Sequence, residues 1–122
     1  MAVEFLKVNE IRKKWGKEVV IVNNDSYCGK ILCINKGNKF SMHFHMLKDE
    51  TWYVAKGALL FRWIDTSDAR IMERILLEGM VVRLSPGDPH QLVAQEDSEI
   101  YEVSTTHFDQ DSYRVGPGDS QT

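Results

Sequence analysis

The sequence predicts an all-β fold, and two observations support this prediction. Short runs rich in β-branched and aromatic residues recur along the chain, and each ends near glycine, proline, asparagine or aspartate. Such runs at regular spacing are typical of a β-sandwich or barrel. The second observation is the length of 122 residues, which suits one domain and is too short for two. We therefore expect a single all-β domain.

The expected elements can be placed in order along the chain. Residues 1–14 form an N-terminal arm, in which the apolar spacing of Val8, Ile11 and Trp15 indicates a helical turn. The last segment, residues 106–122, is polar and loses periodicity, so we expect a C-terminal extension with a flexible end. The strands between them are expected at residues 18–23, 27–35, 40–46, 51–55, 58–64, 70–77, 80–84, 91–94 and 99–105.

Three histidines and one glutamate have the spacing of a metal site. His43 and His45 are two apart in a strand-like run, so their side chains point to the same side. A turn at residues 47–49 would return Glu50 to the same place, and His90 follows a Pro/Gly turn as a fourth candidate. Imidazole suits zinc, copper, iron and nickel, while a carboxylate extends the choice toward manganese. We expect one divalent transition metal, with manganese, iron, zinc, nickel and cobalt left open.

These residues also carry a resemblance to a known family. The chain resembles the cupin superfamily, whose fold is a double-stranded β-helix, a small jelly-roll barrel. The resemblance implies a cupin barrel over residues 15–105 with metal bound by the two paired histidines, the glutamate and the later histidine. Ser85 and Ala94 stand where the second cupin motif has proline and asparagine, which are turn and packing positions. The matching positions are Gly37, His43, His45, Glu50 and Gly57 in the first motif, and Gly79, Gly87 and His90 in the second.

A site of this composition is open rather than structural. Four protein ligands leave two adjacent positions free on a metal that prefers six, and a substrate with neighbouring hydroxyl and carbonyl oxygens can use both. A Lewis-acid metal and a nearby base would then support aldose–ketose isomerisation or epimerisation. Iron and oxygen at the same positions would instead support dioxygenation.

A finer resemblance favours the isomerase. The segments Trp15-Gly16, Glu50-Thr51-Trp52 and Tyr101-Glu102-Val103-Ser104 are similar to the cupin domain of type II mannose-6-phosphate isomerases. The chain departs from that group where Lys39 replaces an arginine, Thr51 a histidine and His43 a glutamine. The resemblance implies a metal-dependent sugar-phosphate isomerase or epimerase. The alternatives are an iron-dependent cupin dioxygenase and a non-catalytic sugar- or metabolite-binding cupin.

Five further residues are candidates for the chemistry. Glu102 has the parity to point inward, where a desolvated carboxylate can act as a general base. Lys39 and Lys48 flank the ligand strand and could hold a phosphate. Trp52 shares the parity of Glu50, and Arg83 is a further candidate for substrate binding. His107 lies outside both motifs and is not expected to bind metal.

Composition limits the partners. The formal net charge is −3 with no basic stripe, which argues against nucleic acid. No membrane-length apolar run or secretory signal is visible, so we expect no membrane partner and a cytoplasmic location. Cys28 and Cys33 are five apart on one strand and are expected to be reduced thiols on opposite faces.

One apolar row needs a cover, and the cupin resemblance implies a homodimer. If His43 and His45 point inward, then Met42, Phe44 and Met46 form a row on the opposite face. Such a row needs a cover, since a large exposed apolar patch usually marks an interface. A second sheet, the chain's own segment at residues 8–15 or another subunit could supply it.

Overall fold

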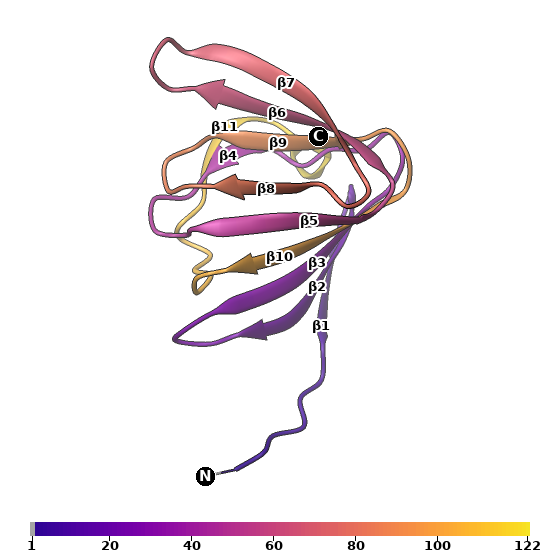
Figure 1. Ribbon diagram of the computed structural model, residues 1–122, viewed down its shortest axis with the longest axis vertical. Helices are drawn as coiled ribbons and strands as arrows, with labels where there is room; N and C mark the ends of the chain where they lie inside the picture. Colours follow the sequence, from indigo (N-terminus) through magenta and orange to yellow (C-terminus); the bar gives the residue numbers. More distant parts are fainter. Residues whose placement is uncertain (1) are drawn as a thin grey trace.

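The computed structural model describes residues 2–122 and consists of two facing antiparallel sheets (Figure 1). One sheet has six strands in the order β1-β2-β3-β10-β5-β8, and the other has five in the order β11-β4-β9-β6-β7. This arrangement confirms the expected all-β jelly roll. The elements are β1 (Asn9–Lys13), β2 (Gly16–Asn23), β3 (Cys28–Ile34), β4 (Met42–Phe44), β5 (Glu50–Lys56), β6 (Ala58–Asp65), β7 (Arg70–Leu77), β8 (Val81–Leu84), β9 (His90–Ala94), β10 (Ser98–Ser104), β11 (Tyr113–Gly116) and the 3-10 helix η1 (Asp119–Gln121).

The hydrophobic core lies between the two sheets and follows from the alternation of side chains along each strand. On β3 every second residue is buried, and β5 and β10 show the same alternation. Ile34, Leu59, Leu92 and Ile100 are at most 1% exposed, and Trp52 is 1% exposed. Burying a side chain of this size stabilises the fold by about 1.5–3 kcal/mol. The core therefore fixes the parity of the same strands that carry the site.

Gly57 makes the tight connection between β5 and β6. Its backbone has φ +93°, and a Cβ there would lie 2.2 Å from the Ser98 Oγ and 2.7 Å from the Asp97 carbonyl oxygen. A larger residue would be strained in conformation and would clash with β10. The last glycine of the first cupin motif is thus required by the turn that follows the ligand-bearing strand.

The N-terminal segment differs from the expected helical turn. Residues Asn9–Lys13 form β1, which pairs with β2 in antiparallel register with Ile11 opposite Glu18. All five residues of β1 are exposed, so no buried apolar stripe exists to favour a helix. The free edge of β2 offers hydrogen bonds instead, and the predicted helical turn is wrong.

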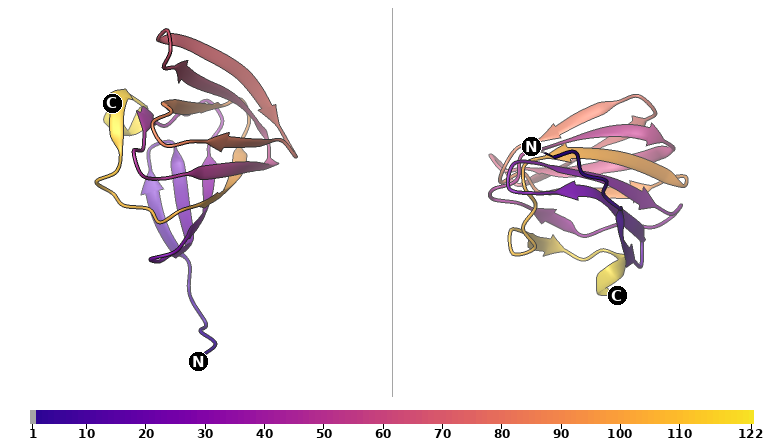
Figure 2. Two further views of the ribbon diagram at one scale, coloured as in Figure 1. Left: turned by 60° about the vertical axis from the view of Figure 1, so that its left-hand side comes forward. Right: turned by 90° about the horizontal axis from the view of Figure 1, so that it is seen from below.

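The C-terminal segment lies along β4 (Figure 2). In β11, Tyr113 pairs with Phe44, and their rings stack with centroids 5.2 Å apart. Met42 is buried where Gly116 lies against it, whereas Met46 remains 54% exposed. The chain's own C-terminal segment, rather than residues 8–15, therefore packs against part of the apolar row.

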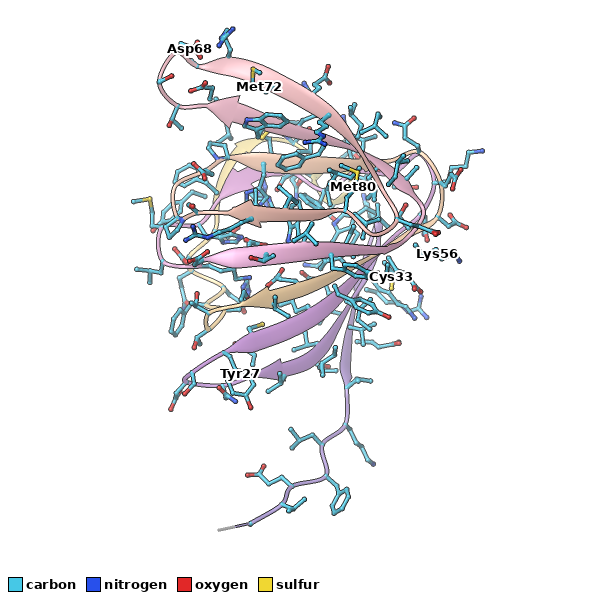
Figure 3. All side chains as sticks on the ribbon, in the orientation of Figure 1. Tyr27, Cys33, Lys56, Asp68, Met72 and Met80 are labelled. Carbon is cyan, nitrogen blue, oxygen red and sulfur yellow. The ribbon has the colours of Figure 1, made fainter. Side chains whose placement is uncertain are left out.

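Both cysteines of β3 are free thiols. Cys28 is buried on the inner face and Cys33 is half-buried on the other face (Figure 3), which confirms that they point apart. Tyr27 precedes β3 at a turn, where the Asn24 side chain accepts its backbone N–H. Within residues 2–122, no helix has the length and apolar character of a membrane span.

Candidate metal centre and its cavity

The three histidines of the predicted metal site converge. His43 lies on β4, His45 follows one residue past its end, and His90 begins β9. The alternation of the strand puts His43 and His45 on one side, and the pairing of β4 with β9 puts His43 directly opposite His90. One nitrogen from each ring lies within 4.8 Å of the others, so these histidines form a group that could hold a metal ion.

Backbone carbonyls fix the protonation of all three rings. The Nδ1 of His43 lies 2.8 Å from the Ser41 carbonyl oxygen, that of His45 lies 2.5 Å from the Asp111 carbonyl, and that of His90 lies 2.8 Å from the Asp88 carbonyl. A carbonyl oxygen only accepts, so each Nδ1 must carry the proton and donate it. Each Nε2 then presents a lone pair, which is the tautomer that binds a metal through Nε2.

Burial keeps the rings neutral. It lowers the pKa of His43 to about 4 and the pKa of His90 well below its ordinary value. The pKa of His45 is lowered for the same reason. Because metal competes with protons for the same nitrogen, neutral rings at physiological pH are ready to bind.

Glu50, the predicted fourth ligand, lies beside the three-histidine group but is not a member of it. Its Oε2 lies 3.5 Å from the Nε2 of His45 and 3.9 Å from the Nε2 of His90. Its Oε1 accepts the indole N–H of Trp52 at 2.7 Å, but Oε2 is buried without a hydrogen-bond partner in residues 2–122. Burial and the neighbouring Glu102 carboxylate raise the pKa of Glu50 to about 8. A cation beside Oε2 would take the place of the missing partner and would stabilise the ionised carboxylate, so these residues fit a divalent metal.

Asp111 links the C-terminal segment to this site. Besides its carbonyl bond to His45, its buried carboxylate accepts the backbone N–H groups of Met46, Leu47 and Lys48 at 2.8–3.1 Å. The carboxylate thus holds the turn that separates the paired histidines from Glu50. Asp111, which lies outside both cupin motifs, therefore orients the candidate ligand His45 and the turn that follows it.

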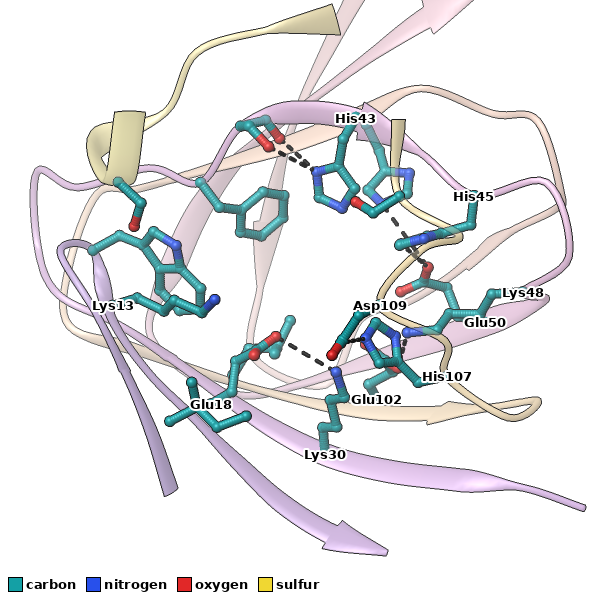
Figure 4. Close-up of a pocket in the computed structure, with 18 of the residues that line it drawn as sticks. Lys13, Glu18, Lys30, His43, His45, Lys48, Glu50, Glu102, His107 and Asp109 are labelled. Atoms are coloured by element: carbon teal, nitrogen blue, oxygen red, sulfur yellow. Dashed lines mark hydrogen bonds and ion pairs between the residues drawn. The ribbon is translucent and has the colours of Figure 1, made fainter. Parts of the chain in front are cut away.

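The site opens into a cavity of about 650 Å³ between the sheets. His43, His45 and Glu50 lie on one side of it, with Lys13 and Glu18 across the cavity (Figure 4). Two of the predicted substrate residues, Lys48 and Trp52, line this cavity, as does the predicted base Glu102.

Glu102 and Lys48 form a buried ion pair beside Glu50. The Nζ of Lys48 lies 3.0 Å from Glu102 Oε2, which also accepts the hydroxyl of Ser104 at 2.9 Å. Burial alone would raise the pKa of Glu102, but the ammonium groups of Lys48 and Lys30 hold it below its ordinary value. Burial likewise opposes the charge on Lys48, but Glu102 and Glu50 raise the pKa of Lys48. At neutral pH the cavity therefore holds an ionised carboxylate close to the candidate metal ligands.

Two predicted substrate residues lie elsewhere. Arg83 is exposed on β8, where its guanidinium donates to both Asp49 oxygens at 2.8 and 3.1 Å. Lys39 forms an isolated bridge with Val93, and its backbone N–H donates to the Asp119 carboxylate. Neither residue belongs to the cavity wall.

The cavity also contains polar residues that sequence reasoning missed. Glu18, Lys30, His107 and Asp109 line it, and the imidazole of His107 lies 3.0 Å from an Asp109 oxygen. Lys30 could have been found, because it shares its parity on β3 with apolar residues that point inward. His107 and Asp109 come from the C-terminal segment, where no periodicity indicates which way a side chain points.

Comparisons with known proteins support the fold. No protein-family model matches the chain, and no curated protein matches it by sequence. Among solved structures, the capsular polysaccharide assembling protein CapF from Staphylococcus aureus matches with a TM-score of 0.78 at 19% identity. That match covers 90% of this chain and 34% of CapF. A tryptophan-to-tyrosine variant of oxalate decarboxylase from Bacillus subtilis also has a TM-score of 0.78, at 17% identity over 88% of this chain and 30% of that one.

The chain has the cupin fold. It spans about one third of the length of each of these neighbours, so the likeness is to one part of a larger protein. A further oxalate decarboxylase structure matches with a TM-score of 0.75 at 15% identity, over 88% of this chain and 30% of that one. That structure was used to study the Mn(II) centres of the enzyme. In this chain, the three-histidine group consists of His43, His45 and His90.

We predict that Asp111→Ala weakens metal binding by roughly 10–100-fold, because loss of a group that orients a ligand has this effect in other metal sites. The substitution frees the turn at Met46–Lys48 and loosens the carbonyl that orients His45. Affinity is measured by competition with a chromophoric chelator for Zn²⁺. Asp109→Ala is the control, since Asp109 is exposed and its carboxylate pairs with the His107 ring and not with a candidate ligand. Equal affinities in the wild type and the Asp111 variant would contradict this role.

Proposed function

We propose that this cupin is a metal-dependent isomerase or epimerase that acts on a sugar phosphate. The observation that supports it best is the ionised Glu102 carboxylate, held by Lys48 in the same cavity as the three histidines. A reaction of this class needs a base beside a polarised carbonyl group, and it needs no further reactant.

A bound divalent metal would supply Lewis-acid polarisation of the substrate carbonyl. His43, His45, His90 and Glu50 would hold it. In isomerisation, Glu102 removes the proton from the carbon next to that carbonyl and returns it to the former carbonyl carbon, while the hydroxyl proton of the neighbouring carbon passes to the former carbonyl oxygen. In epimerisation, a second proton donor on the opposite face returns a proton to the same carbon. The Lys48 ammonium keeps Glu102 ionised before the transfer and stabilises the carboxylate when the proton leaves again.

The sugar-phosphate assignment rests on separate support. The sequence resembles type II mannose-6-phosphate isomerases at Trp15-Gly16 and Glu50-Thr51-Trp52. Lys13 and Arg114 are exposed cations at the cavity wall, and they suit a phosphate better than Lys39 does. The CapF neighbour is named for polysaccharide assembly, which is in keeping with sugar chemistry in this fold.

A test follows from the proton transfer itself. Metal-loaded protein is incubated with mannose 6-phosphate and other hexose phosphates in D₂O, and deuterium at the carbon next to the carbonyl is measured by NMR. We predict exchange in the wild type and a loss of about 10²–10⁴-fold in Glu102→Gln, the usual range for removal of a general base.

The matched control for this test is Glu99→Gln. Glu99 lies on the same strand, outside the cavity wall, so its substitution should leave exchange unchanged. Metal content and melting temperature of both variants are measured alongside. Binding of a hexose phosphate without any exchange in the wild type would contradict the isomerase and favour a binding cupin, whereas oxygen consumption by the iron-loaded protein would favour a dioxygenase.

We also propose a homodimer in a reducing, cytoplasmic environment. Tyr53, Tyr101 and Val81 are paired across the outer face of the six-stranded sheet and are 44–62% exposed. They form an apolar patch of the kind found at interfaces.

Free thiols at Cys28 and Cys33 fit a reducing compartment.

Light scattering at high protein concentration tests the dimer. We predict twice the chain mass of 14.1 kDa for the wild type and the chain mass for Tyr101→Lys, since a lysine would have to be desolvated at the interface. A monomer mass for the wild type would reject the proposal.

A further inference from the structure

A row of charged side chains runs along the cavity away from the candidate metal ligands. It begins at Glu102 on β10, continues to Lys30 on β3 and ends at Glu18 on β2 (Figure 4). Glu102 and Lys30 are directly opposite each other in the strand pairing, and Lys30 Nζ lies 3.6 Å from Glu18 Oε1. The row therefore crosses three adjacent strands on their inner face.

The Lys30 side chain is buried, but its ammonium reaches the cavity without a hydrogen bond to the described residues. The residue is 3% exposed, and the carboxylate within 4 Å of its Nζ in residues 2–122 is that of Glu18. A separation of 3.6 Å is too long for a hydrogen bond. An ammonium has three donors, and burying it without hydrogen bonds is costly. The neighbouring inward position on β3 is Leu32, so an apolar side chain at position 30 would fit the fold.

The pattern of donors and acceptors selects a ligand chemistry. The two carboxylates only accept hydrogen bonds and the ammonium between them only donates. A hydroxyl group does both, so neighbouring hydroxyls on a carbon chain can donate to Glu18 or Glu102 while accepting from Lys30. Together with Lys48 the four groups have no net charge, so the row gives a phosphate or carboxylate no electrostatic advantage.

We propose that Glu18, Lys30 and Glu102 form a subsite for the hydroxyl-bearing carbon chain of an open-chain sugar. The inference rests on the proposed function for the reacting end of that sugar, which lies at the histidine cluster. Trp15 and Leu32 line the same cavity and provide apolar surface for the C–H groups of the chain. A cavity of about 650 Å³ lies within the range of roughly 300–1,000 Å³ found for small-molecule sites.

The experiment compares two metal-chelating probes on the Mn²⁺-loaded protein by calorimetry. Acetohydroxamate carries the chelating group alone, whereas D-arabinonohydroxamate carries the same group on a chain of hydroxyls. We expect the sugar hydroxamate to bind at least about tenfold tighter, because hydrogen bonds to charged groups are worth about this much each. Equal affinities for the two probes in the wild type would overturn the proposal.

Two variants assign the preference to the row. Lys30→Met and Glu18→Gln should each reduce the preference for the sugar hydroxamate by about tenfold. Both should leave the affinity for acetohydroxamate unchanged. Lys17→Met is the control, because its ammonium pairs with Glu10 on the surface and should affect neither probe. An unchanged preference for the sugar hydroxamate in both variants would overturn the subsite. If Lys30→Met no longer binds acetohydroxamate, the preference measured in Glu18→Gln tests the subsite by itself.

A competition separates this subsite from an anion site. Inorganic phosphate should weaken the binding of the sugar hydroxamate no more than it weakens the binding of acetohydroxamate. If phosphate weakened the binding of the sugar hydroxamate selectively, and this effect were lost in Lys30→Met, the proposal would be contradicted. Because affinities are read without turnover, the two hypotheses fail separately. A protein that prefers the sugar probe but exchanges no deuterium would overturn only the isomerase, whereas exchange without the preference would overturn only the subsite.

Discussion

The pairing of β4 with β9 is the constraint on which the rest of the site depends. It places His43 opposite His90, and the alternation along the chain then brings His45 to the same side. Because β4 and β9 are far apart in the sequence, the site forms only when the chain is folded. The carbonyls of Ser41, Asp88 and Asp111 then direct all three Nε2 lone pairs to one place. The strand order thus determines where the three imidazole rings lie, and the backbone hydrogen bonds determine which nitrogen of each ring carries the proton.

Several charged side chains are buried between the two sheets. One end of the space between the sheets is an apolar core around Leu59, Leu92 and Ile100, while the other end contains Glu50, Glu102, Lys30 and Lys48 at 3–4% exposure. Buried ion pairs seldom stabilise a fold relative to apolar side chains of similar size. Their presence here is therefore better explained by ligand chemistry than by stability, and the core at the other end provides the stability that they do not.

The sequence predicted the features of this chain that depend on local alternation. His43, His45 and Glu50 follow from strand parity and one turn, and His90 was assigned through its Pro/Gly turn and the second motif. Glu102 and Trp52 were correctly given inward parity, since β10 and β5 alternate regularly. Arg83 was named as a substrate-binding candidate without a parity argument, and it shares the outward parity of Val81 on β8, where its guanidinium pairs with Asp49.

The parts that could not be predicted depend on contacts between distant segments. The spacing of Val8, Ile11 and Trp15 indicated a helical turn, but the free edge of β2 determines the strand that forms there. Asp111 and His107 lie in a segment without periodicity. The docking of β11 on β4 brings Asp111 to His45, and Asn23 on β2 holds the backbone of His107 beside the cavity. A single sequence carries no signal for such docking, because the interacting residues have no regular spacing.

The most direct test of this account is the metal content of the purified protein and of a His43→Ala, His90→Ala variant, measured by elemental analysis after reconstitution with Mn²⁺, Zn²⁺ or Fe²⁺. The account predicts close to one metal ion per chain in the wild type and its loss in a variant that remains folded. Wild-type protein that takes up none of these metals, or a variant that retains the full amount, would contradict the metal centre on which the proposed chemistry depends.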